Sequence, residues 1–549
     1  MASAAPLQPS HTPPLGVGEG AVLHLQRLMV RYPGAPNPTL DGLNLVLRRG
    51  DRLALVGPSG CGKSTVARAV LQLLPPGSDC QGTLLLAGQD PRQLDQSALR
   101  RLRGEAVGLV FQDPMTRLNP LLTVGEHLRD TLAAHRPAGR AQLRTRVEEL
   151  LGRVGIEPAR YGSYPHEFSG GMRQRVAIAL AMALSPPLVI ADEPTTSLDV
   201  AVTMQVMAEL CELCREAGSA LLLITHDLAM AGRWCERIGV LDGGVLVEEG
   251  GSQQVLTHPV SAVGQRLVQA AREREGRQSE APAATPVVLK LEELRSWHPL
   301  PSPPWQTRWL KAVDGVSLTL HEGETIGVVG ASGCGKSTLC RALMGLAPVR
   351  GGTVELLGQD LRQLRGEALR QARRRLQMVF QDPLACLNPQ MSVGDAVADP
   401  LLIHRLAGRT AARQKAREQL AAVGLEPPEA FEQRRPRQLS GGQQQRVAIA
   451  RALILEPRVL LCDESVSMLD AEVQADVLAL LRELQERLGL GMVFVTHDLS
   501  VASGFCQRVI VLEGGRIVEE GPGAALLKHP RAPITRTLVE ACPRLPVAS

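Results

Sequence analysis

Short, uninterrupted apolar runs alternate along the chain with longer segments that have a helical period. Residues 52–56 form such a run and lead into a glycine-rich stretch, after which the pattern of 65–74 is typical of a helix. Two further apolar runs, 188–191 and 220–224, stand beside turn or helix signals. Strands without polar alternation are typical of a sheet that is covered on both faces. The pattern therefore predicts an α/β fold that carries its chemistry at strand ends.

The same succession of landmarks occurs twice. In chain order the repeated landmarks are residues 57–65 and 330–338, 111–114 and 380–383, 169–171 and 440–442, 192–193 and 463–464, and 225–227 and 496–498. The offset between the copies stays between 269 and 273 residues. Matching landmarks in one order, with so little drift, indicate an internal duplication.

The duplication and the changes in composition predict the domain organisation. The segment around 270–290 is rich in Arg, Glu, Ala and Pro and has no sustained apolar period, which is typical of a linker. The proline-rich N-terminus has no basic-then-apolar layout, so it is interpreted as a disordered tail and not as a secretion signal. The predicted parts are a tail over 1–20, a first domain over 21–260 with a helical subdomain at about 113–167, a linker over 261–287, a second domain over 288–535 with a helical subdomain at about 382–438, and a C-terminal tail over 536–549.

Composition excludes several classes of function. A net charge of +4 on 549 residues gives no basic excess for a nucleic-acid partner, and aromatic residues at 2% offer little for base stacking. No stretch approaches the roughly 18 apolar residues that a membrane helix needs. Cys211 and Cys214 form one C-x-x-C in a helical pattern with no second pair, so core or surface thiols are favoured over a zinc site. The sequence thus predicts a cytoplasmic protein whose membrane association comes through a partner.

The glycine-rich stretches have the spacing of phosphate-binding P-loops. Their glycines let backbone N–H groups face phosphate oxygens at a helix N-terminus, while the lysine reaches the β- and γ-phosphates and the serine holds Mg²⁺. Cys61 and Cys334 lie inside these loops, at positions that require only a small side chain. The predicted ATP-binding residues of the two loops are Gly57, Gly60, Gly62, Lys63, Ser64 and Thr65, and Gly330, Gly333, Gly335, Lys336, Ser337 and Thr338.

In each copy a later apolar strand ends in two acidic residues. Asp192 and Asp463 are placed to join the Mg²⁺ shell, and the adjacent Glu193 and Glu464 are placed to polarise an attacking water. An acidic pair after a strand is by itself most often a turn or a helix start. Beside a P-loop in the same domain, the catalytic interpretation is favoured.

These motifs resemble those of ABC ATPases, because residues 169–175 and 439–446 look like the family's signature motif. The resemblance covers nearly all of 21–535 and implies a RecA-like core plus a helical subdomain in each copy. It implies catalytic and metal-binding roles for the Q-loop residues Gln112 and Gln381, and γ-phosphate contacts for the switch histidines His226 and His497. It also implies ATP contacts by Ser169, Gly170 and Gly171, by Ser440, Gly441 and Gly442, and by the D-loop residues Asp199 and Asp470.

Family geometry implies two composite sites. Two domains of this kind close head to tail, so each ATP lies between one P-loop and the opposite signature. Both copies keep the lysine, the glutamate and the histidine, which predicts two hydrolysing sites and argues against a purely structural pair. Two departures are Met172, where many signatures have Gln, and Ser465, where the first copy has Pro194.

The aromatic residue that stacks on adenine is clear in one copy only. Tyr32, 25 residues before Gly57, resembles the family's A-loop tyrosine. In the second copy Trp297 and His298 are both candidates, and the sequence leaves the choice open.

The sequences 112–120, 381–389 and 166–175 are similar to those of bacterial peptide, opine and nickel importer ATPases. The resemblance implies two permease subunits as partners, a solute-binding protein as an indirect one, and a location on the cytoplasmic side of the bacterial inner membrane. The chain has only short segments after each copy, where peptide-importer ATPases often carry a longer extension. The alternative is a soluble tandem ABC ATPase that acts on ribosomes or DNA, although the zinc ligands, iron–sulfur ligands and long charged linker of such proteins are not seen in the sequence.

Overall fold

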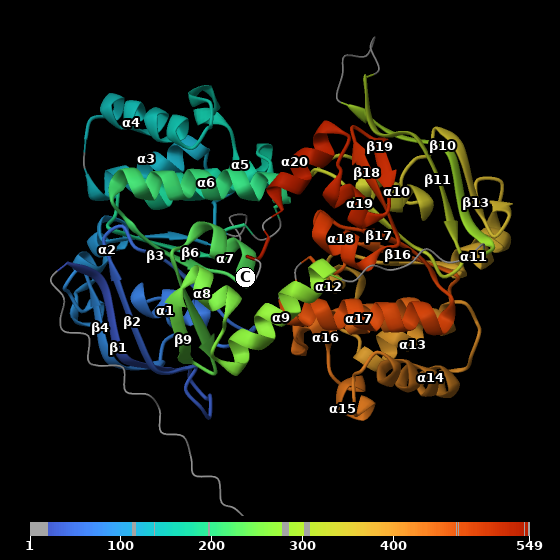
Figure 1. Cartoon of the computed structure of the whole chain (residues 1–549), viewed down its shortest axis with the longest axis horizontal. Helices are drawn as coiled ribbons and strands as arrows, with labels where there is room; N and C mark the ends of the chain where they lie inside the picture. Colours follow the sequence, from blue (N-terminus) through green and yellow to red (C-terminus); the bar gives the residue numbers. More distant parts are fainter. Residues whose placement is uncertain are drawn as a thin grey trace, which may run out of the picture.

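The chain forms two domains of the same architecture that lie side by side (Figure 1). The computed structural model describes residues 20–111, 117–136, 138–195, 198–276, 285–300, 308–467, 469, 471–542 and 544–546. The first domain comprises the described residues up to 276, and the second those from 285 onwards. Among the described residues, no helix is both long and apolar enough to cross a membrane.

The first domain is built on two sheets. A three-stranded antiparallel sheet has the order β2-β1-β4, and a six-stranded sheet has the order β5-β6-β7-β3-β8-β9. Neighbours in the larger sheet are parallel except for β8 and β9. The strands are β1 (Ala21–Arg31), β2 (Leu40–Arg48), β3 (Arg52–Val56), β4 (Asp79–Leu86), β5 (Val107–Val110), β6 (Leu188–Asp192), β7 (Ala220–Ile224), β8 (Arg237–Asp242) and β9 (Val245–Gly251).

Helices α3 and α4 with the short turn η3 form a separate group that packs on α5 (Figure 1). This group is the helical subdomain, and it falls within the predicted range of about 113–167. The helices of the first domain are α1 (Lys63–Val70), η1 (Pro91–Gln93), α2 (Gln96–Glu105), α3 (Val124–His135), α4 (Arg140–Arg153), η3 (Pro158–Gly162), η4 (Pro165–Glu167), α5 (Gly170–Met182), α6 (Val200–Ala217), α7 (Leu228–Trp234), α8 (Ser252–Thr257) and α9 (Ala262–Gly276).

The second domain repeats this plan. Its sheets have the orders β11-β10-β13-β14 and β15-β16-β17-β12-β18-β19. The strands are β10 (Val287–Leu300), β11 (Arg308–His321), β12 (Thr325–Val329), β13 (Gly351–Leu356), β14 (Gln359–Asp360), β15 (Leu376–Val379), β16 (Val459–Asp463), β17 (Gly491–Val495), β18 (Arg508–Glu513) and β19 (Arg516–Gly521). The helices are α10 (Lys336–Leu343), α11 (Gly366–Arg374), α12 (Pro383–Cys386), α13 (Val393–Ile403), α14 (Arg409–Ala422), α15 (Pro428–Glu432), η5 (Pro436–Gln438), α16 (Gly441–Leu453), α17 (Ala471–Leu488), α18 (Leu499–Phe505), α19 (Gly523–Lys528) and α20 (Pro533–Ala541).

Burial on both faces explains the uninterrupted apolar strands. Every residue of β7 and of β17 is buried, and each six-stranded sheet contributes side chains to two core clusters. Local signals fix the helix starts. Thr123 and Glu126, for example, form a capping box at α3, in which each side chain accepts a hydrogen bond from the other residue's backbone N–H. The predicted fold class, two P-loop domains with helical subdomains, is confirmed.

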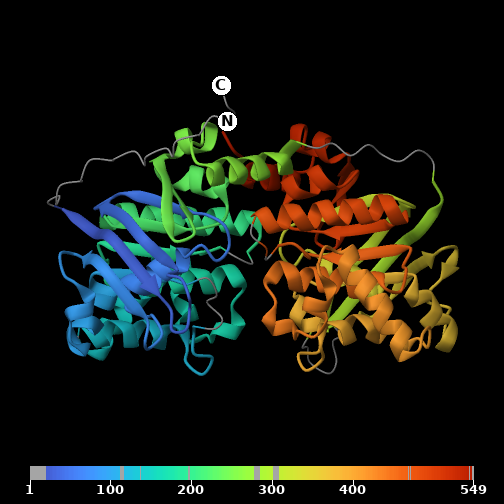
Figure 2. The same cartoon turned by 90° about the horizontal axis from the view of Figure 1, so that it is seen from below.

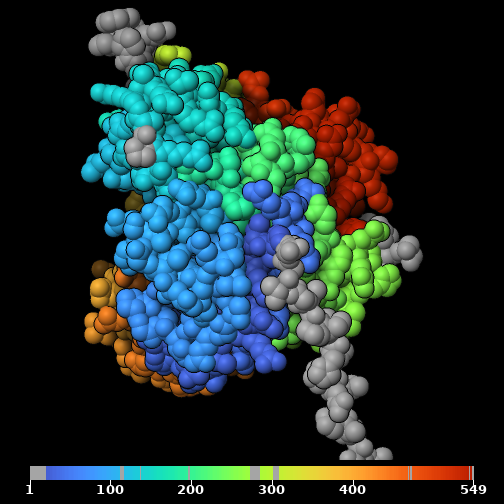
Figure 3. All heavy atoms as spheres, turned by 90° about the vertical axis from the view of Figure 1, so that its left-hand side faces the viewer, coloured from blue at the N-terminus to red at the C-terminus, as the bar shows by residue number. Residues whose placement is uncertain are grey.

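The segments after each domain differ from the sequence prediction. The predicted linker contains all of α9, and the predicted C-terminal tail contains most of α20. Both helices lie along one side of the molecule, where α9 reaches the second domain and α20 reaches the first (Figure 2). In the space-filling view the red C-terminal segment borders the green residues of the first domain (Figure 3). The tail predicted over 1–20 lies, apart from Gly20, outside the described residues.

Candidate functional site

The first glycine loop joins β3 to α1 and holds its lysine over its own carbonyl groups. Gly57 has φ 155°, and a Cβ there would lie 2.1 Å from the Leu241 carbonyl oxygen. Gly62 caps α1 with φ 106°, a left-handed conformation that favours glycine. The Lys63 ammonium donates to the carbonyls of Gly57 and Pro58 at 2.7 and 2.8 Å. The loop therefore gathers a buried cation and the free N–H groups of a helix N-terminus.

The second glycine loop, between β12 and α10, has the same geometry. Lys336 is 5% exposed and donates to the carbonyls of Gly330 and Ala331 at 2.8 and 3.1 Å. Gly335 has φ 111°, and a Cβ there would lie 1.9 Å from the Ala312 carbonyl oxygen. Both loops are thus built for close backbone approach to an anion.

Each loop places its serine against the aspartate that ends a central strand. The Ser64 hydroxyl donates to Asp192 Oδ1 over 2.9 Å, and Ser337 donates to Asp463 Oδ1 over 2.9 Å. Burial raises the pKa of both aspartates, so a nearby cation would stabilise their charged form. A hydroxyl and a carboxylate at this separation are oxygen ligands of the kind that Mg²⁺ prefers, so the residues present fit that ion.

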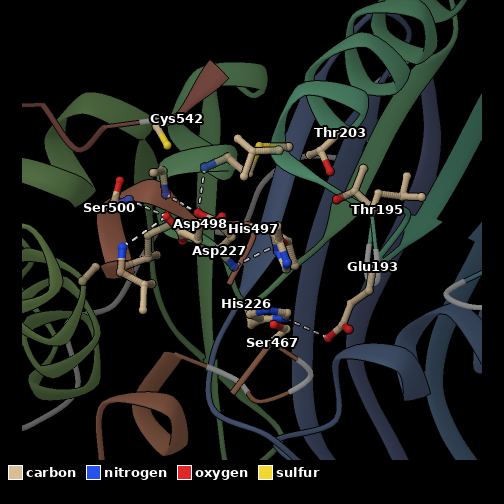
Figure 4. Close-up of a pocket in the computed structure, with 18 of the residues that line it drawn as sticks. Glu193, Thr195, Thr203, His226, Asp227, Ser467, His497, Asp498, Ser500 and Cys542 are labelled. Carbon is tan, nitrogen blue, oxygen red and sulfur yellow. Dashed lines mark hydrogen bonds and ion pairs between the residues drawn. The ribbon is translucent and has the colours of Figure 1, made fainter. Parts of the chain in front are cut away.

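The glutamate after each aspartate has a strained backbone and a histidine partner. Glu193 and Glu464 both have φ 46°, in the left-handed region where non-glycine residues are rare. His226 Nδ1 lies 3.3 Å from Glu193 Oε1 (Figure 4). In the second copy His497 Nδ1 lies 3.7 Å from Glu464 Oε2. Each glutamate carboxylate therefore lies beside the switch histidine of its own domain.

In the second copy the Q-loop residue joins this pair. Gln381 Nε2 donates to Glu464 Oε2 at 3.0 Å. Burial alone would raise the pKa of Glu464, but the hydrogen bond and charge of His497 outweigh it and hold the pKa below its usual range. Burial alone would lower the pKa of His497, but the hydrogen bond and charge of Glu464 outweigh it and raise the pKa. Gln112, its counterpart in the first copy, lies outside the described residues.

Both signature serines cap the helices that follow them. Ser169 accepts from the Met172 N–H and Ser440 from the Gln443 N–H, each at 3.4 Å. Gln443 also accepts from the Ser440 N–H at 3.0 Å, which the thioether of Met172 does not reproduce in the first copy. A larger residue at the second glycine of either signature would require its neighbour to move, because a Cβ on Gly171 or Gly442 would lie 2.3 Å from a valine methyl group.

One D-loop residue connects the two domains directly. Asp199 Oδ1 accepts from the Val202 N–H at 2.9 Å and so caps α6, while Oδ2 accepts from the Ser332 N–H in the second P-loop at 3.1 Å. The side chain is 8% exposed. Asp470, the corresponding residue of the second copy, lies outside the described residues. The contact places the D-loop of one domain against the P-loop of the other.

The aromatic candidates differ between the copies. Tyr32 Oη lies 3.1 Å from Thr65 Oγ1, at the end of the first P-loop. Tyr32 stands five residues after the left-handed residue Arg27 in β1, and His298 stands five residues after the left-handed Glu293 in β10. Register therefore makes His298 the counterpart of Tyr32.

Trp297 is already engaged elsewhere, because the Lys311 ammonium lies 4.9 Å from the centre of its ring. The register that separates His298 from Trp297 could not be read from the sequence, since β10 continues to Leu300 whereas β1 ends at Arg31.

The family model of the ABC transporter matches the chain twice, over residues 40–196 and 313–467. The chain belongs to the ABC transporter family. It is accordingly an ATP-binding protein and an ATPase, as the motifs imply.

Long relatives share both domains. The peptidoglycan transport ATP-binding protein YejF of Agrobacterium fabrum is 41% identical, over 92% of this chain and 93% of that protein. The glutathione import ATP-binding protein GsiA of Pectobacterium atrosepticum is 37% identical, over 97% of this chain and 91% of that one. The uncharacterized ABC transporter ATP-binding protein YejF of Escherichia coli is 37% identical, over 94% and 99%. The tandem arrangement is therefore common to the family members that this chain resembles.

Sequence reasoning missed the contacts between domains. Asp199 and Ser332 each lie in a motif, but their hydrogen bond joins residues far apart in the chain, and no local motif marks the packing of α9 and α20. The cysteines behave as expected of core thiols: Cys211 and Cys214 are buried, and burial raises their pKa to about 11 and about 12. Among the described residues, no group of three or more His, Cys, Asp or Glu side chains is arranged to hold a metal ion.

Proposed function

We propose that this protein is the ATP-hydrolysing subunit of a bacterial importer for peptides or related small solutes, with two composite ATP sites between its domains. The observation that carries the composite sites is the hydrogen bond from Ser332 of the second P-loop to Asp199 of the first D-loop. It supports a head-to-tail arrangement, in which each P-loop faces the D-loop and signature of the other domain. The peptidoglycan and glutathione transport named for the relatives supports the substrate class.

In each composite site, different residues bind the phosphates, the Mg²⁺ ion and the adenine ring. Lys63 and Lys336 bind the phosphates with the loop N–H groups, and the signature residues of the opposite domain complete the shell. Ser64 with Asp192, and Ser337 with Asp463, would hold Mg²⁺, which supplies charge neutralisation on the phosphates when bound. Gln112 and Gln381 would complete the set of Mg²⁺ ligands. Tyr32 and, in the second domain, His298 stack on adenine.

The glutamates act on the water that attacks the γ-phosphate. Glu193 and Glu464 accept its hydrogen bond and orient it in line, and His226 and His497 hold the carboxylates in place. The half-buried Glu464 keeps a lowered pKa and so stays ionised at neutral pH, as this role requires. Because both copies contain the pair, both sites hydrolyse ATP.

The partners are two permease subunits that bind the helical subdomains on the cytoplasmic side of the inner membrane, with a solute-binding protein reached through them. In the second domain a hollow of about 750 Å³ between α13 and α14 is lined by Gln390, Leu402 and Arg413, among others. Leu121, at the position in the first domain that corresponds to Gln390, is 82% exposed. An exposed leucine and a hollow at matching positions are suited to receiving short helices of a partner.

The test is a pulldown of the tagged protein from its native cells in mild detergent, followed by mass spectrometry. Two multi-span permease subunits are expected, and Leu121→Asp should reduce their recovery without changing basal ATPase activity. Val518→Asp, at an exposed position on β19, is the matched control and should leave recovery unchanged. Recovery of ribosomal or DNA-repair proteins without any permease would overturn the importer and leave the ATPase intact.

A further inference from the structure

Each domain is followed by a helix that contacts the other domain. Helix α9 follows the first domain and packs against α17 and α18 of the second (Figure 1). Helix α20 follows the second domain and packs against α6 of the first. The exchange is reciprocal, because α6 and α17 are corresponding helices of the duplication. We call this contact the exchanged-helix interface.

On the first side, α9 is anchored in its own domain and faces the other. Val263, Leu267 and Val268 are buried in the core cluster of the first domain. Leu267 and Ala271 also line a cavity to which Val501, in α18, contributes from the second domain. One helix therefore buries apolar surface against both domains at once.

The second side mirrors the first. Leu538 of α20 is 1% exposed within the core cluster of the second domain. Leu545, a few residues later, is 7% exposed and belongs to the core cluster of the first domain. In return Val200, at the start of α6, packs against the core of the second domain.

The interface lies against the helices that begin directly after the switch histidines. Asp227 caps α7 and Asp498 caps α18, each accepting two backbone N–H hydrogen bonds. A cavity of about 160 Å³ separates these two helix starts, and Cys542 lies there beside Ser500 (Figure 4). Glu193 and the two switch histidines also line this cavity, but the apolar contacts of α9 and α20 use none of the ATP-site residues.

We propose that the exchanged-helix interface is a hinge that does not depend on nucleotide: it keeps the two domains joined at one edge while the ATP sites open and close. Apolar contacts buried in both cores persist without ligand, whereas the contact at the P-loops is small and polar. Because the interface abuts α7 and α18, rotation about it moves the two switch histidines in a concerted way.

The experiment uses the full chain with a protease site inserted between residues 277 and 284. After cleavage, sedimentation velocity without nucleotide is expected to show one species that contains both halves. Nicked Lys63→Ala/Lys336→Ala protein should behave alike, which excludes retained ATP as the cause. Separation of the nicked wild-type halves without nucleotide would overturn the hinge.

Two substitutions at the interface complete the test. Leu545→Asp places a carboxylate in the core of the other domain, and Ala271→Asp places one on the half-buried face of α9. Each should weaken the association of the nicked halves about tenfold or more. Val260→Asp, at a 78% exposed position just before α9, should not. Thermal unfolding of the uncut variants monitors folding, and unchanged association in a folded Ala271→Asp protein would contradict the proposal.

Discussion

Replacement of Asp199 separates what this side chain does for its own helix from what it does for the opposite ATP site. In Asp199→Asn one oxygen remains to cap α6, but the amide group that replaces the other oxygen cannot accept the Ser332 N–H. The lost bond is charge-assisted and Asp199 is only 8% exposed, so its removal costs about 1.5–3 kcal/mol. That corresponds to a loss of about 10- to 150-fold in the equilibrium for closing the second site. Asp199→Ala loses the cap as well, at about 1 kcal/mol more.

The assay measures ATP turnover and thermal unfolding on the same preparations. Asp199→Asn should lower turnover while the melting temperature stays close to that of the wild type, and Asp199→Ala should lower both. Asp199→Ser, whose hydroxyl retains the cap but not the second acceptor, is the matched control and should follow the asparagine variant. Wild-type turnover in Asp199→Asn would refute the link between the first D-loop and the second P-loop.

Two further predictions concern the second domain. Gly335→Ala should abolish nucleotide binding at the second P-loop, because the new Cβ would lie 1.9 Å from the Ala312 carbonyl oxygen. Gly333→Ala has open space around its Cβ and should cost only about 1 kcal/mol of backbone strain. Binding of a fluorescent ATP analogue distinguishes the two variants. Because the pKa of His497 is raised in the folded protein, protonated His497 stabilises the fold below pH 6.5, and this stabilisation is lost as the pH rises. Because the pKa of Glu464 is lowered, ionised Glu464 stabilises the fold above pH 4.5, and this stabilisation is lost in acid. The stabilisation from the pair is therefore greatest between pH 4.5 and pH 6.5. The melting temperatures of wild type and His497→Gln should differ most within this window, and the difference should narrow at lower and at higher pH. A difference that does not change with pH would contradict this prediction.

The ATP-binding parts were predictable because their chemistry is local. A glycine at φ 106° before Lys63 and an aspartate at the end of a fully apolar strand are each fixed by a few neighbouring residues. The duplication strengthened every such prediction, since each feature occurs in both copies. Fold class, the presence of two domains and their family followed from these motifs and are confirmed.

The rest depended on contacts between distant segments. Leu545 stands between proline residues and leaves no periodic signal. Val263, Leu267 and Ala271 recur at helical spacing, but this pattern does not show that their face of the helix meets the other domain. The choice between Trp297 and His298 depended on the length and register of β10, which only the pairing with β11 defines. The Asp199–Ser332 bond joins residues 133 positions apart. Such features are set by how the two domains meet and not by local preference.

The most direct test of two composite, hydrolysing sites is ATP occupancy and turnover in Glu193→Gln/Glu464→Gln. Removing both carboxylates while leaving the P-loops, signatures and serine–aspartate pairs intact should give a chain that retains two ATP molecules and no longer turns them over. Each single variant should keep one competent site. Steady-state hydrolysis unchanged in the double variant, or retention of a single ATP per chain, would contradict the account.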